Sequence, residues 1–288
     1  MHDYLLSILL GVLEGLTEFL PVSSTAHLRI AEALFAIDLK DGFWKMYSIV
    51  IQLGAVLALT AFFWRRILNF LRTFPRGEGE DRTLLTHPLS LVLVAFVVTA
   101  IPAFLLTKLI GKNLENLAVM AWALLIGGIV MWIVDSVFVR PRIQRMEQTT
   151  LPTAIWIGAV QVLSAVFPGT SRSMSTIAAG QVAGMSREAA LEFSFFLSIP
   201  TMFVATGYDL LKTIRPHAAT EAIAPLVMTQ HLWTVLAIGF VSAFVVALAV
   251  VAWFLHWVRR HGFAPFAIYR IVLGLVLLFA LSHGLLGR

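Results

Sequence analysis

The sequence predicts an all-α polytopic membrane protein, in which six transmembrane helices and two re-entrant helical hairpins form an inverted repeat. Three observations predict this fold. Apolar residues make up 59% of the 288 positions and charged residues only 13%, a composition unlike that of a soluble domain. Six stretches are long and apolar enough to span a bilayer, and one motif occurs twice, 147 residues apart.

The repeated motif predicts the two hairpins. It is Gly-x-x-(Glu/Gln)-x-x-(Thr/Ser)-x-x-(Leu/Phe)-Pro-x-(Ser/Thr)-Ser, and it occupies residues 11–24 and 158–171. Within the segments 4–37 and 154–184, the central proline stops a first short helix, and the hydroxyl residues behind it suit the start of a second. Each short helix falls below the roughly 20 residues that cross a bilayer, so both segments are predicted to be re-entrant.

The remaining long apolar stretches are the predicted spans. They are residues 46–64, 88–107, 117–138, 189–211, 230–258 and 265–286. Residues 65–87 are rich in charge and predict a loop. Each half then holds one hairpin and three spans, and because three is odd, residues 148–288 lie upside down relative to residues 1–147. The hairpin tips are expected to meet near the midplane, in a polar pocket of a single integral membrane domain, 1–288.

Basic loop residues predict the orientation, because cytoplasmic loops of membrane proteins carry the excess of lysine and arginine. One side carries Arg65, Arg66, Arg72, Arg76, Arg82, Arg140, Arg142, Arg145, Arg187, Arg259 and Arg260; the other carries Lys40, Lys45, Lys108, Lys112, Lys212, Arg215 and Arg288. The first side is therefore predicted to be cytoplasmic, with both termini and the first hairpin opening outward. The net charge of +5 is spread over these loops, so no nucleic-acid partner is expected. Because the chain has no cysteine, thiolate catalysis and Cys-ligated zinc are excluded.

Two carboxylates stand in the first predicted hairpin. Glu14 and Glu18 are four residues apart and share one face of a helix. Carboxylates within a membrane segment are costly, and a functional role is the default interpretation. An anionic substrate beside them requires either a bound divalent cation, with magnesium or calcium suited to oxygen ligands, or protonation.

Hydroxyl groups and one arginine follow the two prolines. Ser23, Ser24 and Thr25 open the helix after Pro21, and Gly169, Thr170, Ser171, Arg172 and Ser173 follow Pro168. Free backbone N–H groups at a helix start bind anions, glycine permits close approach, and a guanidinium suits phosphate oxygens. Ordinary N-capping explains such hydroxyls in most helices, but two converging clusters favour a phosphate site.

Further ionisable groups lie near these clusters or inside the spans. His27 is three residues beyond Ser24 and is the natural general base or acid for that serine. Glu192 and Arg270 both lie a few residues inside the predicted cytoplasmic ends of their helices, and a structural ion pair between them is predicted.

These motifs resemble those of the bacterial undecaprenyl pyrophosphate phosphatase family, also called the bacitracin-resistance family. The glutamate-rich motif is 13–27, Leu-Glu-Gly-Leu-Thr-Glu-Phe-Leu-Pro-Val-Ser-Ser-Thr-Ala-His, and the second is 168–173, Pro-Gly-Thr-Ser-Arg-Ser. Similar blocks at 50–54, 192–195 and 265–270 extend the resemblance over nearly the whole chain. The chain departs from the family pattern at Ala26 and Met174, where glycine is usual, and a methionine beside a phosphate would narrow the pocket.

The resemblance implies a multi-pass enzyme of the bacterial inner membrane that removes the terminal phosphate of undecaprenyl pyrophosphate, recycling the cell-wall lipid carrier. It implies catalytic roles for Glu14, Glu18, Ser24, His27 and Arg172. In the mechanism we expect, a divalent cation held by Glu14 and Glu18 bridges the pyrophosphate while His27 activates Ser24; direct attack by water is the alternative. A prenyl-phosphate flippase is the rival function, because transporters share inverted repeats with broken helices. The sequence does not decide the oligomeric state, and a homodimer is one possibility.

Overall fold

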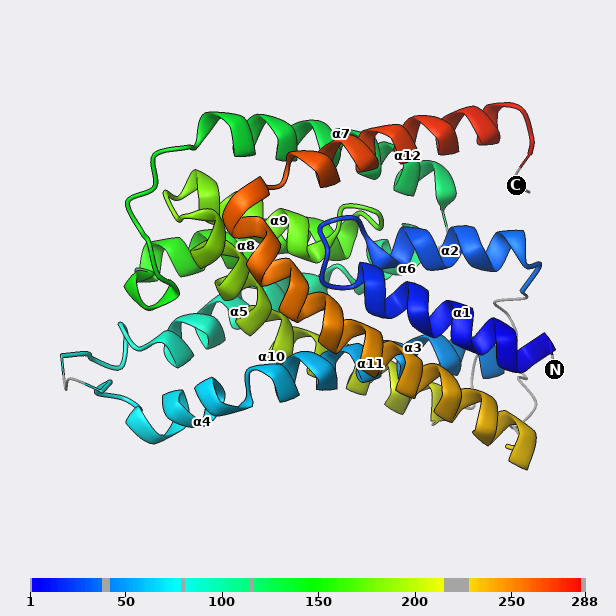
Figure 1. Ribbon diagram of the computed structural model, residues 1–288, viewed down its shortest axis with the longest axis horizontal. Helices are drawn as coiled ribbons and strands as arrows, with labels where there is room; N and C mark the ends of the chain where they lie inside the picture. The colour runs from blue at the N-terminus through cyan, green and yellow to red at the C-terminus, as the bar shows by residue number, and fades with distance from the viewer. Residues whose placement is uncertain (1, 38–41, 79–80, 114–115, 215–227, 286–288) are drawn as a thin grey trace.

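The computed structural model describes residues 2–37, 42–78, 81–113, 116–214 and 228–285. All named elements in these ranges are helical. They are α1 His2–Thr17, α2 Ser24–Leu34, α3 Gly42–Phe62, α4 Trp64–Thr73, α5 Pro88–Leu105, α6 Thr107–Asn113, α7 Leu117–Val137, the short 3₁₀ turn η1 Met146–Gln148, α8 Leu151–Val166, α9 Arg172–Val182, α10 Arg187–Ile214, α11 Gln230–His261 and α12 Ala264–Ser282 (Figure 1). Lys40, Arg215 and Arg288, used above to predict orientation, lie outside the described residues, as does residue 286 at the end of the last predicted span.

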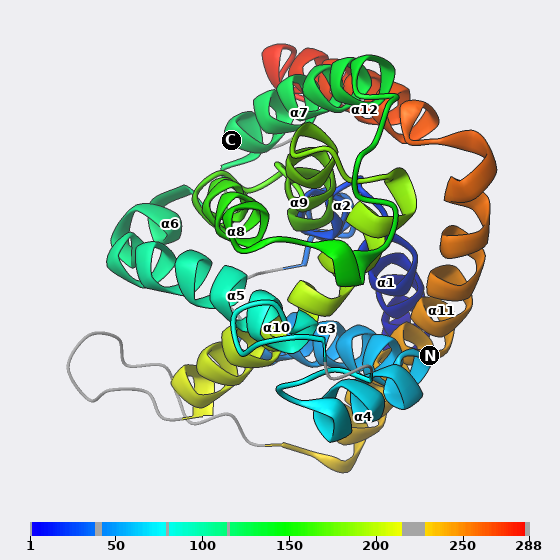
Figure 2. The ribbon, with the colours of Figure 1, turned by 90° about the vertical axis from the view of Figure 1, so that its left-hand side faces the viewer.

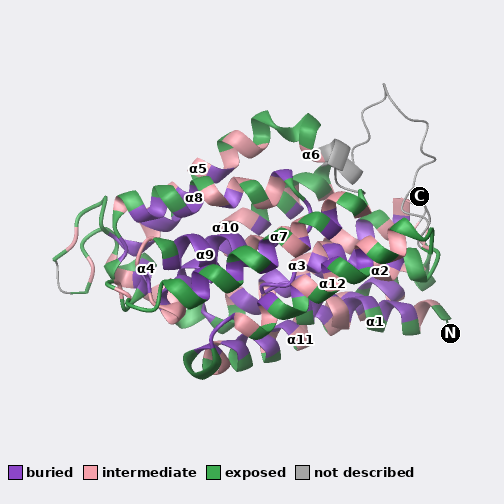
Figure 3. Ribbon diagram, turned by 90° about the horizontal axis from the view of Figure 1, so that it is seen from above, coloured by how far each residue is buried: buried purple, intermediate pink, exposed green. Residues whose placement is uncertain are grey.

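The prediction of six spans is confirmed. Within the described ranges, α3, α5, α7, α10, α11 and α12 are long and apolar enough to cross a membrane, and each overlaps one predicted stretch. Large apolar side chains at helical spacing stay exposed along their outer faces, for example Trp122, Ile126, Ile129 and Ile133 on α7 (Figure 3). An exterior of this kind suits contact with lipid and not with water.

The predicted charged loop at 65–87 is wrong in its first part, which folds as α4. Arg66 helps to hold this segment as a helix. Its Nη1 donates to Glu192 Oε1 at 2.7 Å, and its Nη2 donates to Glu147. Its guanidinium also lies 5.7 Å from the ring centre of Phe70. Partial burial raises the pKa of the Glu147 carboxyl, but its own backbone amide and Arg66 outweigh that effect and lower it. These long-range contacts hold α4 beside η1 and α10.

The four helices of the repeated motif, α1, α2, α8 and α9, pack among the long helices. Viewed end-on, α7 and α12 lie at the top, α11 and α5 at the two sides and α3 and α10 below, with α1, α2, α8 and α9 between them (Figure 2). Along the molecule, α1 and α2 occupy the end at which α12 finishes, and α8 and α9 occupy the opposite end (Figure 1). The helix pairs α1–α11 and α8–α5 pack closely, as do α7–α12 and α3–α10.

Glycines of the repeated motif allow the closest of these contacts. A Cβ added at Gly11 would lie 2.5 Å from the carbonyl oxygen of Gly239 in α11, and one added at Gly158 would meet the carbonyl oxygen of Ala95 in α5. Backbone atoms cannot move aside as flexible side chains do. The repeated glycine therefore sets the depth at which each short helix seats against a spanning helix.

We expect Gly11→Ala and Gly158→Ala to destabilise the fold by about 1–3 kcal/mol each, because the added methyl group overpacks a backbone contact. The measurement is thermal unfolding of the purified protein in detergent. Gly207→Ala is the matched control, since a Cβ at Gly207 has nothing within 4 Å and alanine is the better helix former. Equal unfolding temperatures for the three variants would contradict this explanation.

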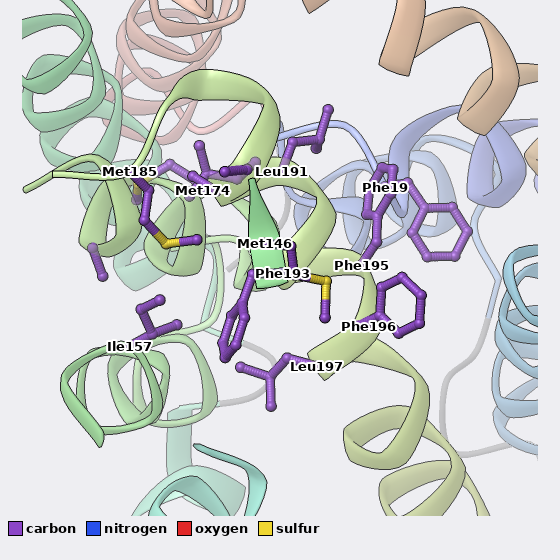
Figure 4. Close-up of a cluster of buried hydrophobic side chains, with 14 of the residues drawn as sticks. Phe19, Met146, Ile157, Met174, Met185, Leu191, Phe193, Phe195, Phe196 and Leu197 are labelled. Atoms are coloured by element: carbon purple, nitrogen blue, oxygen red, sulfur yellow. The ribbon is translucent and has the colours of Figure 1, made fainter. Parts of the chain in front are cut away.

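The loop between α1 and α2 is anchored in the main apolar core. Phe19 is completely buried and meets Phe195 of α10 edge-to-face, with ring centres 5.6 Å apart (Figure 4). Met174 lies in the same core. Its Cε would be 2.8 Å from a Cβ at Gly127 of α7, so this side chain fills space between helices. The expectation that Met174 narrows a phosphate pocket is therefore not supported.

Candidate active site

Two loops carry the predicted site, the first between α1 and α2 and the second between α8 and α9. Both loops end in the same backbone conformation. Ser23 and Ser171 are the N-cap residues of α2 and α9, with φ of 73° and 70°, a left-handed conformation that is costly for serine. Their side chains accept hydrogen bonds from the amides of Ala26 and Met174. These caps are 148 residues apart and the motifs 147, so Ser24 stands opposite Arg172 and not opposite Ser171.

Glu18 joins residues of both loops. The Ser24 hydroxyl donates to Glu18 Oε2, and Arg172 Nη2 donates to Glu18 Oε1 at 3.0 Å. The second guanidinium nitrogen, Arg172 Nη1, is buried and has no partner among the described residues. One carboxylate thus holds the hydroxyl hydrogen of a serine and fixes one arm of an arginine, while the other arm is left for an anion.

Glu14 lies one helical turn before Glu18, with 1% of its surface exposed. Neither oxygen of its carboxylate has a hydrogen-bond partner in the part of the chain that the structure describes, and the carboxylate of Glu18 repels it. A buried carboxylate in this position requires a proton or a cation. The described residues contain no group of three or more acidic or histidine side chains that would hold a metal by themselves.

The donor set nevertheless fits Mg²⁺ or Ca²⁺. Magnesium sites commonly use one or two carboxylates and complete their coordination with water and substrate phosphates. Glu14 supplies two unpartnered oxygens, and Glu18 lies beside it. The corresponding position in the second half, Gln161, is neutral and donates to Thr201 Oγ1 at 3.2 Å. Of these two matching positions, only the one in the first half of the chain carries a carboxylate.

One of the hydroxyl groups expected to bind phosphate, that of Ser173, joins the second loop to the first. Ser171 and Ser173 are buried with their hydroxyl oxygens 3.1 Å apart, and Ser173 donates to the Leu20 carbonyl of the other loop at 3.0 Å. Thr25 and Thr170 are half-buried beside the cap serines. Gly169 has φ +93°, and a Cβ there would lie 2.6 Å from the Met120 carbonyl oxygen. That position excludes a side chain because it packs against α7.

The structure does not pair His27 with Ser24. His27 Nδ1 lies 2.7 Å from the Ser23 carbonyl oxygen and must therefore carry the hydrogen, while Nε2 lies 2.6 Å from the hydroxyl of Tyr269. The rings of His27 and Tyr269 are also stacked. In this arrangement the proton acceptor beside the Ser24 hydroxyl is Glu18, and His27 ties the first loop to α12.

Comparison with known proteins shows the family of this chain. The model of one protein family, described as Bacitracin resistance protein BacA, matches residues 7–276. The chain belongs to this family. A curated relative from Koribacter versatilis is 64% identical over 96% of this chain and 98% of its own length. Relatives from Thermus thermophilus and Rhizobium etli (strain CIAT 652) are 43% and 41% identical, over 95% and 99% of both chains. Each of the three is named undecaprenyl-diphosphatase.

Two residues of this BacA-family protein contact the centre and were not expected to do so. Tyr269 holds His27, and Arg270 donates to the carbonyl oxygens of Pro21 and Gly169, one in each loop. The predicted ion pair between Arg270 and Glu192 is wrong, because Glu192 binds Arg66. The sequence does carry a signal, since Tyr269 and Arg270 are adjacent polar residues in an apolar span, but it does not identify their partners.

Proposed function

We infer that this protein is an undecaprenyl-diphosphatase, an integral membrane hydrolase that converts undecaprenyl diphosphate to undecaprenyl phosphate and inorganic phosphate. The single observation that carries the mechanism is the bridge from Ser24 through Glu18 to Arg172, which joins the two halves of the chain. The BacA family match and the names of the relatives support the activity and its link to bacitracin resistance.

In the proposed reaction, Ser24 Oγ attacks the terminal phosphorus and its proton passes to Glu18. The bond from that phosphorus to the bridging oxygen breaks, and undecaprenyl phosphate leaves. Water then attacks the same phosphorus, the bond from phosphorus to Ser24 Oγ breaks, the proton on Glu18 returns to that oxygen, and inorganic phosphate leaves. In the alternative, Glu18 takes the proton from a water that attacks directly. In both versions, Arg172 Nη1 and the amides at the starts of α2 and α9 neutralise the transferring phosphoryl oxygens.

Glu14 and Glu18 are proposed to hold a divalent cation, Mg²⁺ or Ca²⁺. A bound cation would screen the two carboxylates from the negative charge of the pyrophosphate and polarise its oxygens. Ser23, Thr25, Gly169, Thr170, Ser171 and Ser173 are proposed to line the phosphate site. His27 is assigned to holding the Ser23 carbonyl, and through it the left-handed turn before Ser24.

The proposed topology places α1–α2 and α8–α9 as re-entrant hairpins of an inverted repeat, 1–147 and 148–288, within one membrane domain. Support comes from packing: α1 seats on α11 as α8 seats on α5, and the repeated glycine makes both contacts. We place the protein in the bacterial inner membrane, with both termini and the site open to the outer side, following the arginine-rich loops of the opposite side.

The test is release of inorganic phosphate from undecaprenyl diphosphate by the purified protein in detergent, with and without EDTA. We expect release that EDTA abolishes and added Mg²⁺ or Ca²⁺ restores. Reconstituted vesicles distinguish the flippase alternative: movement of a labelled prenyl phosphate across the bilayer, with no phosphate release from correctly folded protein, would overturn the hydrolase assignment.

A further inference from the structure

Arg270 lies between the two loops that carry the site. Its side chain is 0% exposed. Nη1 donates to the Pro21 carbonyl oxygen at 3.2 Å, and Nη2 donates to the Gly169 carbonyl oxygen at 3.0 Å. We propose that Arg270 is a positioning residue, which holds the two loops in register so that Ser24 and Glu18 of one meet Arg172 of the other. This inference rests on the proposed function.

The place of Arg270 in the repeat explains how one side chain serves both loops. Its Nη2 also donates, at 3.1 Å, to the carbonyl oxygen of Ala123, the residue that precedes it by 147 positions. That is the offset of the repeated motif, so Arg270 packs against its own counterpart in α7. Ala123 has a small side chain, and Gly127, one turn later, faces the guanidinium directly. The small residues of α7 thus make space for the Arg270 side chain of α12. At the corresponding position of the first half, the residue is Ala123 and not a second arginine.

The contacts of Arg270 leave neither terminal nitrogen free to bind phosphate, and Nε, the remaining guanidinium nitrogen, is buried and has no partner among the described residues. Both terminal nitrogens are engaged with backbone carbonyl oxygens, and the group has no exposed surface. Its effect on the reaction must pass through the loops. Pro21 is three residues before Ser24, and Gly169 is three residues before Arg172. Each loop also contains a serine in the left-handed conformation, which persists only when surrounding contacts enforce it.

The test compares steady-state phosphate release by the full-length protein and its Arg270→Met and Arg270→Lys variants. We expect Arg270→Met to lower kcat by about 100-fold with KM changed less than about 3-fold, because displaced catalytic groups cost turnover more than binding. Arg270→Lys keeps the charge but cannot span two loops, and we expect at least about 10-fold loss of kcat. Wild-type kcat in Arg270→Lys would show that only the positive charge matters. It would overturn the proposal that Arg270 holds the two loops in register.

A second route displaces the guanidinium without removing it. In Gly127→Ala the new methyl group would meet Arg270 Nη2, so we expect the same loss of kcat at unchanged KM. Arg187→Met is the matched control. Arg187 binds the buried carboxylate of Asp135 at the other end of α7, and its loss should lower the unfolding temperature while leaving kcat at the wild-type value. An equal drop in kcat for Arg187→Met would make the Arg270 effect one of general stability.

The double variant Arg270→Met/Arg172→Ala separates positioning from an independent contribution. If Arg270 acts through the placement of Arg172, its loss costs little once Arg172 is gone, and the two fold-losses do not multiply. Multiplying losses would overturn the proposal. The wild-type assay distinguishes the two hypotheses. If wild type releases no phosphate, the proposed function is rejected. If wild type and Arg270→Met release phosphate at the same rate, only the positioning role of Arg270 is rejected.

Discussion

Glu18→Gln is expected to lower kcat for phosphate release by on the order of 10³-fold or more. Glutamine has nearly the same shape, so the helix and the buried packing should survive. It cannot accept the Ser24 proton as a carboxylate does, and it loses the ion pair with Arg172. The measurement is steady-state phosphate release from undecaprenyl diphosphate at saturating substrate.

Glu188→Gln is the matched control for this variant. Glu188 pairs with Arg259 outside both loops, and this pair is partly exposed. Exposed ion pairs contribute little to stability. We expect its kcat to equal that of wild type. If Glu18→Gln were as active as this control, the hydrogen bond from Ser24 to Glu18 would have no part in the reaction.

The same series distinguishes the two forms of attack. If Ser24 is the nucleophile, Ser24→Ala should lose about as much kcat as Glu18→Gln, and the double variant should lose hardly more, because the two residues act as a unit. Acid-quenched wild type should then carry phosphate on Ser24. A small loss in Ser24→Ala beside a large loss in Glu18→Gln would assign the proton transfer to an attacking water.

The six spans could be predicted because their signal is local. Some 20 consecutive apolar residues cannot be accommodated otherwise, whatever the rest of the chain does. The repeated motif likewise indicated where Glu18, Ser24 and Arg172 would converge, since two interrupted helices at matching positions imply loops that meet. The structure brings these three together by hydrogen bonds.

The failures concern partners that are distant in sequence. Arg270 was predicted to pair with Glu192, and composition gave no reason to prefer a backbone carbonyl as its acceptor. The helix α4 likewise depends on partners distant in sequence, because Arg66 pairs with Glu192 and the buried Phe70 packs against Phe196. His27 was assigned to Ser24 by spacing along a helix, but rotation about its side-chain bonds decides the matter, and the Ser23 carbonyl and Tyr269 fix that rotation.

Glu14→Gln is expected to remove the response of the protein to divalent cations. Glu14 offers two buried oxygens without any donor, beside a second carboxylate, so a cation would gain most of its protein ligands there. We expect the Mg²⁺ or Ca²⁺ concentration for half-maximal activity to rise at least about 100-fold, with kcat/KM at fixed low cation falling in parallel. Binding of Mn²⁺, followed by its electron paramagnetic resonance signal, should be lost in Glu14→Gln and retained in Glu188→Gln.

Thermal unfolding separates this explanation from shared protonation. A cation that binds the folded state stabilises it, so added Mg²⁺ or Ca²⁺ should raise the unfolding temperature of wild type and leave that of Glu14→Gln unchanged. If wild type gained no stability from the cation and kept full activity in EDTA, a proton between Glu14 and Glu18 would replace the metal in the mechanism.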